Sequence, residues 1–182
     1  MSPSRFFSSL VILSFIYVNS LPAQAASAQE IDVKVNYALE KFKEDVDIAD
    51  NFLAMAKGVL VFPEVIKVGF VLGGEGGEGA LRIGGQTVDY YNTLSASFGF
   101  QLGAQLKTII IIFLDQEALD KFRNSSNWEA GVDGSVALIE FGAGKEITTT
   151  SINEPIIGFV FNNKGLMYNL TIEGTKITKI NK

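Results

Sequence analysis

Carboxylates are the main groups in this sequence that could do chemistry, because its 182 residues include no cysteine and no histidine. A thiolate nucleophile, a histidine base and a cysteine or histidine metal site are therefore excluded. Glu75 and Glu78 lie in the glycine-rich run 73–79, where they could act as acid and base or bind a hard cation. No calcium-loop spacing surrounds them, and the run lacks the Gly-Lys-Ser/Thr of a phosphate-binding loop. We expect this run to form a turn or bulge between strands, with no catalytic residue, cofactor or metal.

The charge balance limits which partners the chain can bind, and the first residues indicate its cellular location. With 15 Lys+Arg against 20 Asp+Glu the formal net charge is -5, the wrong sign for a nucleic-acid binder. Arg5 precedes the apolar run 6–18, which is shorter than the roughly 20 residues of a membrane-spanning helix. Small residues follow at Ala23 and Ala25, which is the layout of a cleaved signal peptide. We expect residues 1–25 to be removed and the domain, 29–182, to be periplasmic or secreted.

Two helices are predicted around a sheet. Apolar residues recur at three- and four-residue steps from 30 to 56, which indicates a long amphipathic helix. Its polar face carries more acids than lysines, so we expect it to pack on a sheet and not to lie in a membrane surface. A short helix is expected near 115–123, with Asp115 as its N-cap.

The remainder of the chain reads as strands. Residues 93–108 alternate between apolar and polar side chains, which predicts a long strand or hairpin with one dry face and one wet face. The runs 59–62, 109–114 and 156–161 are apolar throughout and are expected to be central strands covered on both faces. The predicted fold class is α+β: a long N-terminal helix packed on a curved, glycine-rich antiparallel sheet or barrel.

Several short motifs in order resemble those of one known family. The segment 56–63 reads Ala-Lys-Gly-Val-Leu-Val-Phe-Pro and is followed by Gly69-Phe70 and by the glycine-rich run. Similar motifs occur at 95–99, 101–105, 131–135 and 164–167. Together they resemble the SYLF domain family over nearly the whole mature chain.

The SYLF resemblance implies a binding protein without catalytic activity. Eukaryotic members bind phosphoinositides and other anionic lipids, some bind actin in endocytic patches, and secreted bacterial members look closest to this chain. The expected partner is an anionic lipid or membrane surface, whereas an exported bacterial protein would not meet cytoplasmic actin. In this reading Lys57, Lys67 and Lys107 contact lipid headgroups, and Phe62 beside Pro63 leans into the acyl boundary.

Three other functions stay open at this stage. A structural or protein-interaction component of the cell envelope would bind a protein and no lipid. A small outer-membrane barrel would also be exported and would also alternate along its strands. An enzyme would need Glu75, Glu78 and Asp89 to converge in a pocket, and nothing in their spacing forces this.

Overall fold

The computed structural model describes residues 26–69, 72–98, 105–139, 153–162, 165–166 and 172–182. Helices and strands follow one another in this order: α1 (Ala28–Asp45), α2 (Ala49–Met55), β1 (Gly58–Gly69), β2 (Leu72–Ile83), β3 (Gln86–Phe98), β4 (Gln105–Phe113), α3 (Gln116–Asn124), β5 (Asn127–Glu129), β6 (Ala137–Leu138), β7 (Ile156–Asn162), β8 (Gly165–Leu166) and β9 (Lys176–Ile180). The predicted α+β class is confirmed.

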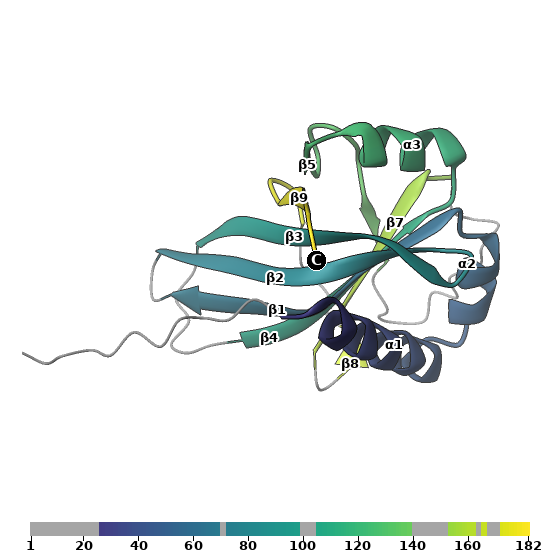
Figure 1. Cartoon of the computed structure of the whole chain (residues 1–182), viewed down its shortest axis with the longest axis horizontal. Helices are drawn as coiled ribbons and strands as arrows, with labels where there is room; N and C mark the ends of the chain where they lie inside the picture. The colour runs from purple at the N-terminus through teal and green to yellow at the C-terminus, as the bar shows by residue number, and fades with distance from the viewer. Residues whose placement is uncertain (1–25, 70–71, 99–104, 140–152, 163–164, 167–171) are drawn as a thin grey trace, which may run out of the picture.

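One strongly curled sheet organises these elements (Figure 1). Its strand order is β5-β9-β3-β2-β1-β4-β7-β6, with β8 paired to β7. Only the β6–β7 pair is parallel among the described pairs. The central strands β1, β4 and β7 are the three apolar runs expected to be covered on both faces, and that expectation is confirmed.

Two hydrophobic layers lie on opposite faces of the sheet. On one face, α1 and α2 pack through Phe42 and Phe52 onto Phe159 of β7, with ring centroids 4.7 and 5.6 Å apart. On the other face, α3 packs Leu119 and Phe122 onto the alternate residues of the same strands. Both layers form because successive strand residues point to opposite faces.

The N-terminal helix is interrupted, which corrects the prediction of one helix from 30 to 56. Helix α1 ends at Asp45, and Val46 is extended with φ -131°. Val46 and Ile48 are β-branched and flank Asp47, and all three residue types have low helix propensity. Because α2 buries Ala49 and Phe52 in the same layer as α1, the apolar spacing continues across the break.

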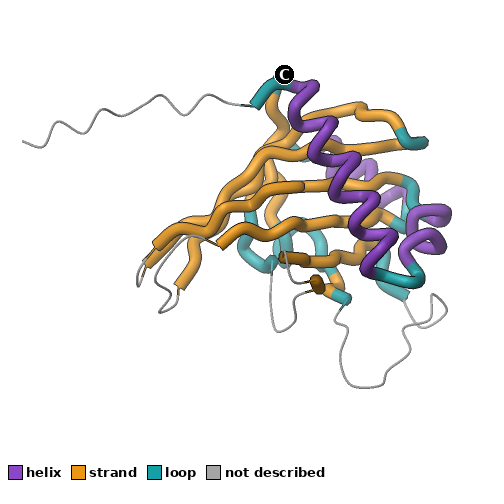
Figure 2. The backbone as a smooth tube through the Cα atoms, turned by 90° about the horizontal axis from the view of Figure 1, so that it is seen from below, coloured by secondary structure: helices purple, strands orange, loops and turns teal. Residues whose placement is uncertain are grey.

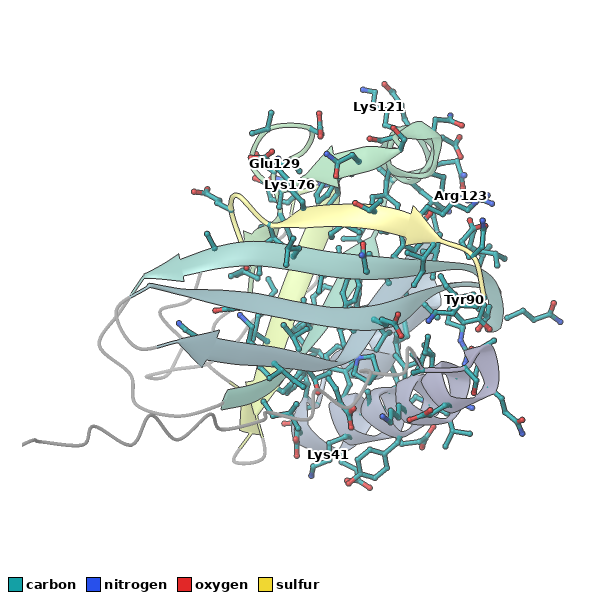
Figure 3. The ribbon with its side chains drawn as sticks, turned by 60° about the vertical axis from the view of Figure 1, so that its left-hand side comes forward. Lys41, Tyr90, Lys121, Arg123, Glu129 and Lys176 are labelled. Carbon is teal, nitrogen blue, oxygen red and sulfur yellow. The ribbon has the colours of Figure 1, made fainter. Side chains whose placement is uncertain are left out.

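A polar cluster fixes α1 across β2 and β3. The Asp32 carboxylate accepts hydrogen bonds from Thr87 Oγ1 at 2.6 Å and from the Tyr90 hydroxyl at 3.0 Å. Arg82 of β2 donates to Asn36 Oδ1 at 2.9 Å. Burial, and then the hydrogen bond to Asp32, raises the pKa of Tyr90. Tyr90 points from β3 toward α1 in Figure 3.

The glycine-rich run lies within strand β2, so of the turn or bulge predicted for 73–79 the turn is wrong, whereas an irregularity in the β1–β2 pairing does fall opposite this run. The turn comes later, at Gly84 and Gly85, whose φ values of +58° and +81° suit a tight hairpin. Glycine is required inside the strand at Gly77 and Gly79, because a Cβ there would collide with the carbonyl oxygens of Glu64 and Val61. The pairing of β1 with β2 is irregular between Val61 and Ile66, and this irregularity brings the two backbones close.

Candidate functional site

Four strands project beyond the layer formed by α1. We call this part the sheet arm: residues 66–69 of β1, 72–76 of β2, 94–98 of β3 and 105–107 of β4. In Figure 2, α1 crosses the strands diagonally and leaves their far ends without a helix on that face. The arm therefore presents side chains that the core of the domain does not cover.

An apolar row crosses the α1-side face of the arm. It consists of Leu106, Ile66, Gly76 and Leu94, which are register partners on β4, β1, β2 and β3. Leu94 is 63% exposed, Leu106 55% and Ile66 49%. A Cβ placed on Gly76 would lie 3.7 Å from Leu94 Cδ1, so Leu94 reaches over the glycine toward Ile66. The row is a contiguous apolar surface on neighbouring strands.

The exposed row corrects the prediction of a dry face for 93–108. Strand alternation is present in β3 and β4, but Leu94 and Leu106 are on the solvent side while Thr93 is buried. The two strands also do not pair with each other, since β2 and β1 lie between them in the sheet. Residues 99–104, in the middle of the alternating run, lie outside the described part of the chain.

A lysine side chain on β9 lies next to the apolar row, beside Leu94. Lys176 is the register partner of Leu94 and is exposed. Its ammonium lies 3.9 Å from a carboxylate oxygen of Glu129 on β5, and Figure 3 shows the two labelled residues beside each other. This weak, solvent-exposed pair leaves Lys176 available to an anionic group next to the row.

The opposite face of the arm carries a charged triad, which consists of Lys67, Glu75 and Lys107. One Glu75 oxygen lies 3.4 Å from the Lys67 ammonium and the other contacts the Lys107 ammonium. The three side chains are only 24%, 11% and 12% exposed. Because two lysines share one carboxylate, the triad has a formal charge of +1 in a half-buried setting.

Replacing Glu75 with glutamine is expected to destabilise the protein, because it leaves two ammonium groups facing each other. Removing one partner of a fully buried pair costs about 3–5 kcal/mol. We expect about 2 kcal/mol here because solvent reaches the triad. Lys67→Gln is the control. It should lower the free energy of unfolding by less, because it keeps the Glu75–Lys107 pair. Urea unfolding at two salt concentrations measures both, and equal midpoints for the two variants would contradict the role of the triad.

The structure brings together two of the four residues expected to contact lipid. Lys67 and Lys107 meet at Glu75, on the face opposite the apolar row. Lys57 is exposed at the start of β1, far along the strand from the arm. Phe62 is 0% exposed and packs in the layer under α3, so its ring has no surface to offer an acyl chain in this conformation.

The apolar row is not apparent from the sequence. The signal for it lies in Ile66, Leu94 and Leu106, which alternate with polar residues like any half-buried strand. What distinguishes these exposed positions from covered ones is the course of α1 across the sheet (Figure 2), which the alternation in the strands does not reveal.

Three acids that a catalytic pocket would require do not converge. Glu75 belongs to the triad, whereas Glu78 points to the α1 side and binds Lys182 at 2.8 Å. Asp89 pairs with Arg123 at 3.2 Å and also with Lys179. Each of these carboxylates therefore has its own cationic partner.

Other candidate sites in the described residues are weak. No group of three or more acids lies close enough to hold a metal ion in that part of the chain. A shallow, open depression runs along α3 from Gln116 to Ser125 and is lined by polar side chains. Among the helices that the structure describes, none has the length and apolar character needed to cross a membrane.

Comparison with known proteins finds a family match in the C-terminal part of the chain. Residues 94–182 match the family model Ysc84, described as "Las17-binding protein actin regulator". The matched segment includes Leu94, Leu106 and Lys107, so it covers two residues of the apolar row and one of the triad. A search of curated proteins found no match to this chain.

Proposed function

We propose that the protein binds lipid membrane surfaces through the apolar row, without catalysis, and the proposal starts from the match of residues 94–182 to the Ysc84 (SYLF) family model. The SYLF resemblance implies association with lipids, and the apolar row is the observation that carries the proposal here. The family description concerns a Las17-binding protein that regulates actin. We propose no actin binding for this chain, because its first 25 residues predict export.

The apolar row has the properties of a surface that inserts shallowly into a bilayer. Single exposed leucines are ordinary, but three large apolar side chains in one row across β4, β1 and β3, with only Gly76 of β2 between the last two, form a patch that water does not favour. Fully burying a Leu or Ile side chain contributes about 1.5–3 kcal/mol. Since each of the three is about half exposed, the remaining gain is about 1 kcal/mol per residue.

Electrostatic attraction contributes less than the apolar row. Lys176 beside the row would gain about 1 kcal/mol near an anionic bilayer. The formal charge of the whole chain is -5, which opposes that gain. The headgroup roles predicted for Lys67 and Lys107 do not fit the same contact, because Glu75 holds both on the other face of the arm. We therefore propose a weak, reversible contact in which apolar insertion dominates and anionic headgroups add a smaller part.

We propose that this contact takes place outside the cytoplasm. Arg5, the apolar run 6–18 and the small residues Ala23 and Ala25 support export. The membrane would then be one that faces the periplasm or the cell exterior.

Co-sedimentation with vesicles tests the proposal. We expect the protein to bind phosphatidylcholine vesicles weakly, to bind vesicles with added phosphatidylglycerol somewhat better, and to retain most of the binding at high salt. In the double variant Leu94→Thr/Leu106→Thr the affinity should fall about tenfold or more, since tenfold corresponds to 1.4 kcal/mol. Threonine keeps a high strand propensity, so the fold should be maintained.

A matched double variant on α1 serves as the control. Val33 and Tyr37 are 63% and 73% exposed and belong to α1, which is not part of the arm. Val33→Thr/Tyr37→Gln should bind vesicles like the original chain. No binding to either vesicle type at low salt would overturn the lipid proposal and favour a protein partner in the envelope. If the two double variants lose vesicle affinity equally, the apolar row is not the surface that binds the membrane.

A further inference from the structure

The beginning of the described chain is held by a small polar cluster. The backbone N–H of Ala26 donates to Glu78 Oε2 at 3.2 Å. The Lys182 ammonium donates to the Ala26 carbonyl oxygen at 2.8 Å and lies 2.8 Å from Glu78 Oε1. The Lys182 side chain is only 9% exposed. We call Ala26, Glu78 and Lys182 the Glu78 cluster.

The same point of the chain is where a signal peptidase would cut. Ala23 and Ala25 are the small residues that such an enzyme reads, and the bond that follows joins Ala25 to Ala26. We propose that the chain is cleaved at this bond and that Glu78 then binds the α-ammonium group of Ala26. This inference rests on the Glu78 cluster and is independent of membrane binding.

The reaction is hydrolysis by a signal peptidase of the host cell. Water attacks the Ala25 carbonyl carbon, and the bond from that carbon to the Ala26 nitrogen breaks. Ala25 leaves as a carboxylate at the end of the removed segment. The Ala26 nitrogen leaves as an amine and takes a proton at neutral pH. The amide donor that faces Glu78 in the uncut chain is thereby replaced by an ammonium.

The surroundings of Ala26 give Glu78 a specific role after cleavage. The positive end of the α1 dipole lies close by, since the helix begins at Ala28, and the Lys182 ammonium is also near. Both disfavour a further positive charge. Glu30 in the first turn of α1 is engaged by Lys34 at 3.1 Å. Glu78 is therefore the acid placed to bind the ammonium, through a charge-assisted hydrogen bond stronger than the amide bond it replaces.

The first measurement is the mass of the protein obtained from the full-length chain in a bacterial host that has a secretion pathway. We expect a product that begins at Ala26. A product that begins at any other residue would overturn the proposal.

The second measurement is the rate at which an acylating reagent modifies the α-amine of that product at pH 6.5. Only the neutral amine reacts, so binding to Glu78 should slow modification. Glu78→Gln should raise the rate about tenfold, because the amine then faces Lys182 without a carboxylate. Glu64→Gln is the control: Glu64 pairs with Lys34 at 2.8 Å and does not contact Ala26. Equal rates in the two variants would overturn the role of Glu78.

A measurement on the unsubstituted product guards against misfolding of the Glu78 variant. The rate of modification is followed against pH, and its midpoint gives the pKa of the α-amine. We expect this pKa to lie above the about 7.7–8.0 of an ordinary chain terminus, because the Glu78 carboxylate in direct contact with the ammonium outweighs the Lys182 ammonium and the helix dipole. A midpoint at or below that range would show that Glu78 does not outweigh them and would overturn its role.

Discussion

Replacing Gly79 with alanine is expected to lower the free energy of unfolding by about 3 kcal/mol, among the larger effects of a single overpacking substitution. A Cβ at this position would collide with the Val61 carbonyl oxygen and lie 2.7 Å from a ring carbon of Phe62. Neither neighbour can move easily: the first is backbone of a central strand, and the second is fully buried. Chemical denaturation followed by circular dichroism measures the loss.

Gly74 provides a control in the same strand. Among the side chains and backbone that the structure describes, a Cβ there would meet only the Ser95 carbonyl oxygen, at 3.9 Å, which is an ordinary contact. Gly74→Ala should be neutral or should stabilise the protein by about 0.5–1 kcal/mol, because alanine loses less conformational entropy than glycine on folding. If both variants unfold at the same denaturant concentration, close packing of β1 on β2 does not explain the glycine at 79.

Replacing Phe122 with alanine is expected to cost about 3–5 kcal/mol, the usual range for removing a buried aromatic ring. Phe122 of α3 is 0% exposed and contacts three other rings. Its centroid lies 4.9 Å from those of Tyr91 and Phe113 and 5.5 Å from that of Trp128. Urea unfolding measures the loss, and the fluorescence of Trp128, the one tryptophan of the chain, reports whether its ring stays buried.

Phe122→Leu distinguishes loss of volume from loss of α3. Leucine refills most of the space, so the loss should be much smaller and the Trp128 emission should stay close to that of the original chain. A red-shifted emission in both variants would indicate that α3 detaches whenever the ring is changed. Unchanged unfolding of Phe122→Ala would contradict the central place of this residue in the second layer.

The elements of the fold could be predicted from the sequence where one pattern dominates. The apolar runs of β1, β4 and β7 have no polar face, so only burial on both sides suits them. Helix α3 begins at Gln116 with Asp115 as its N-cap, as expected, and the Asp115 side chain accepts from the Ala118 N–H at 2.9 Å. The fold class and the central strands could therefore be predicted, because short stretches of sequence are enough to indicate them.

The candidate site could not be predicted because it depends on where α1 lies. Leu94 and Leu106 have the same alternation as a covered strand, and only the diagonal course of α1 leaves them exposed. The pairing of Lys67 and Lys107 with Glu75 joins three strands, and no local pattern encodes that meeting. Phe62 is the last residue of the apolar run 59–62, yet β1 continues to Gly69 and Phe62 is buried within it.

The strand order has a consequence for the nascent chain. β1, β2 and β3 pair with their neighbours in sequence, but β9 covers the free edge of β3 and β7 covers that of β4. Until the ribosome has synthesised residues 156–180, both edges present unpaired backbone groups, which favour aggregation. The sheet is therefore completed only late in translation, and until then its open edges are surfaces that a chaperone could bind.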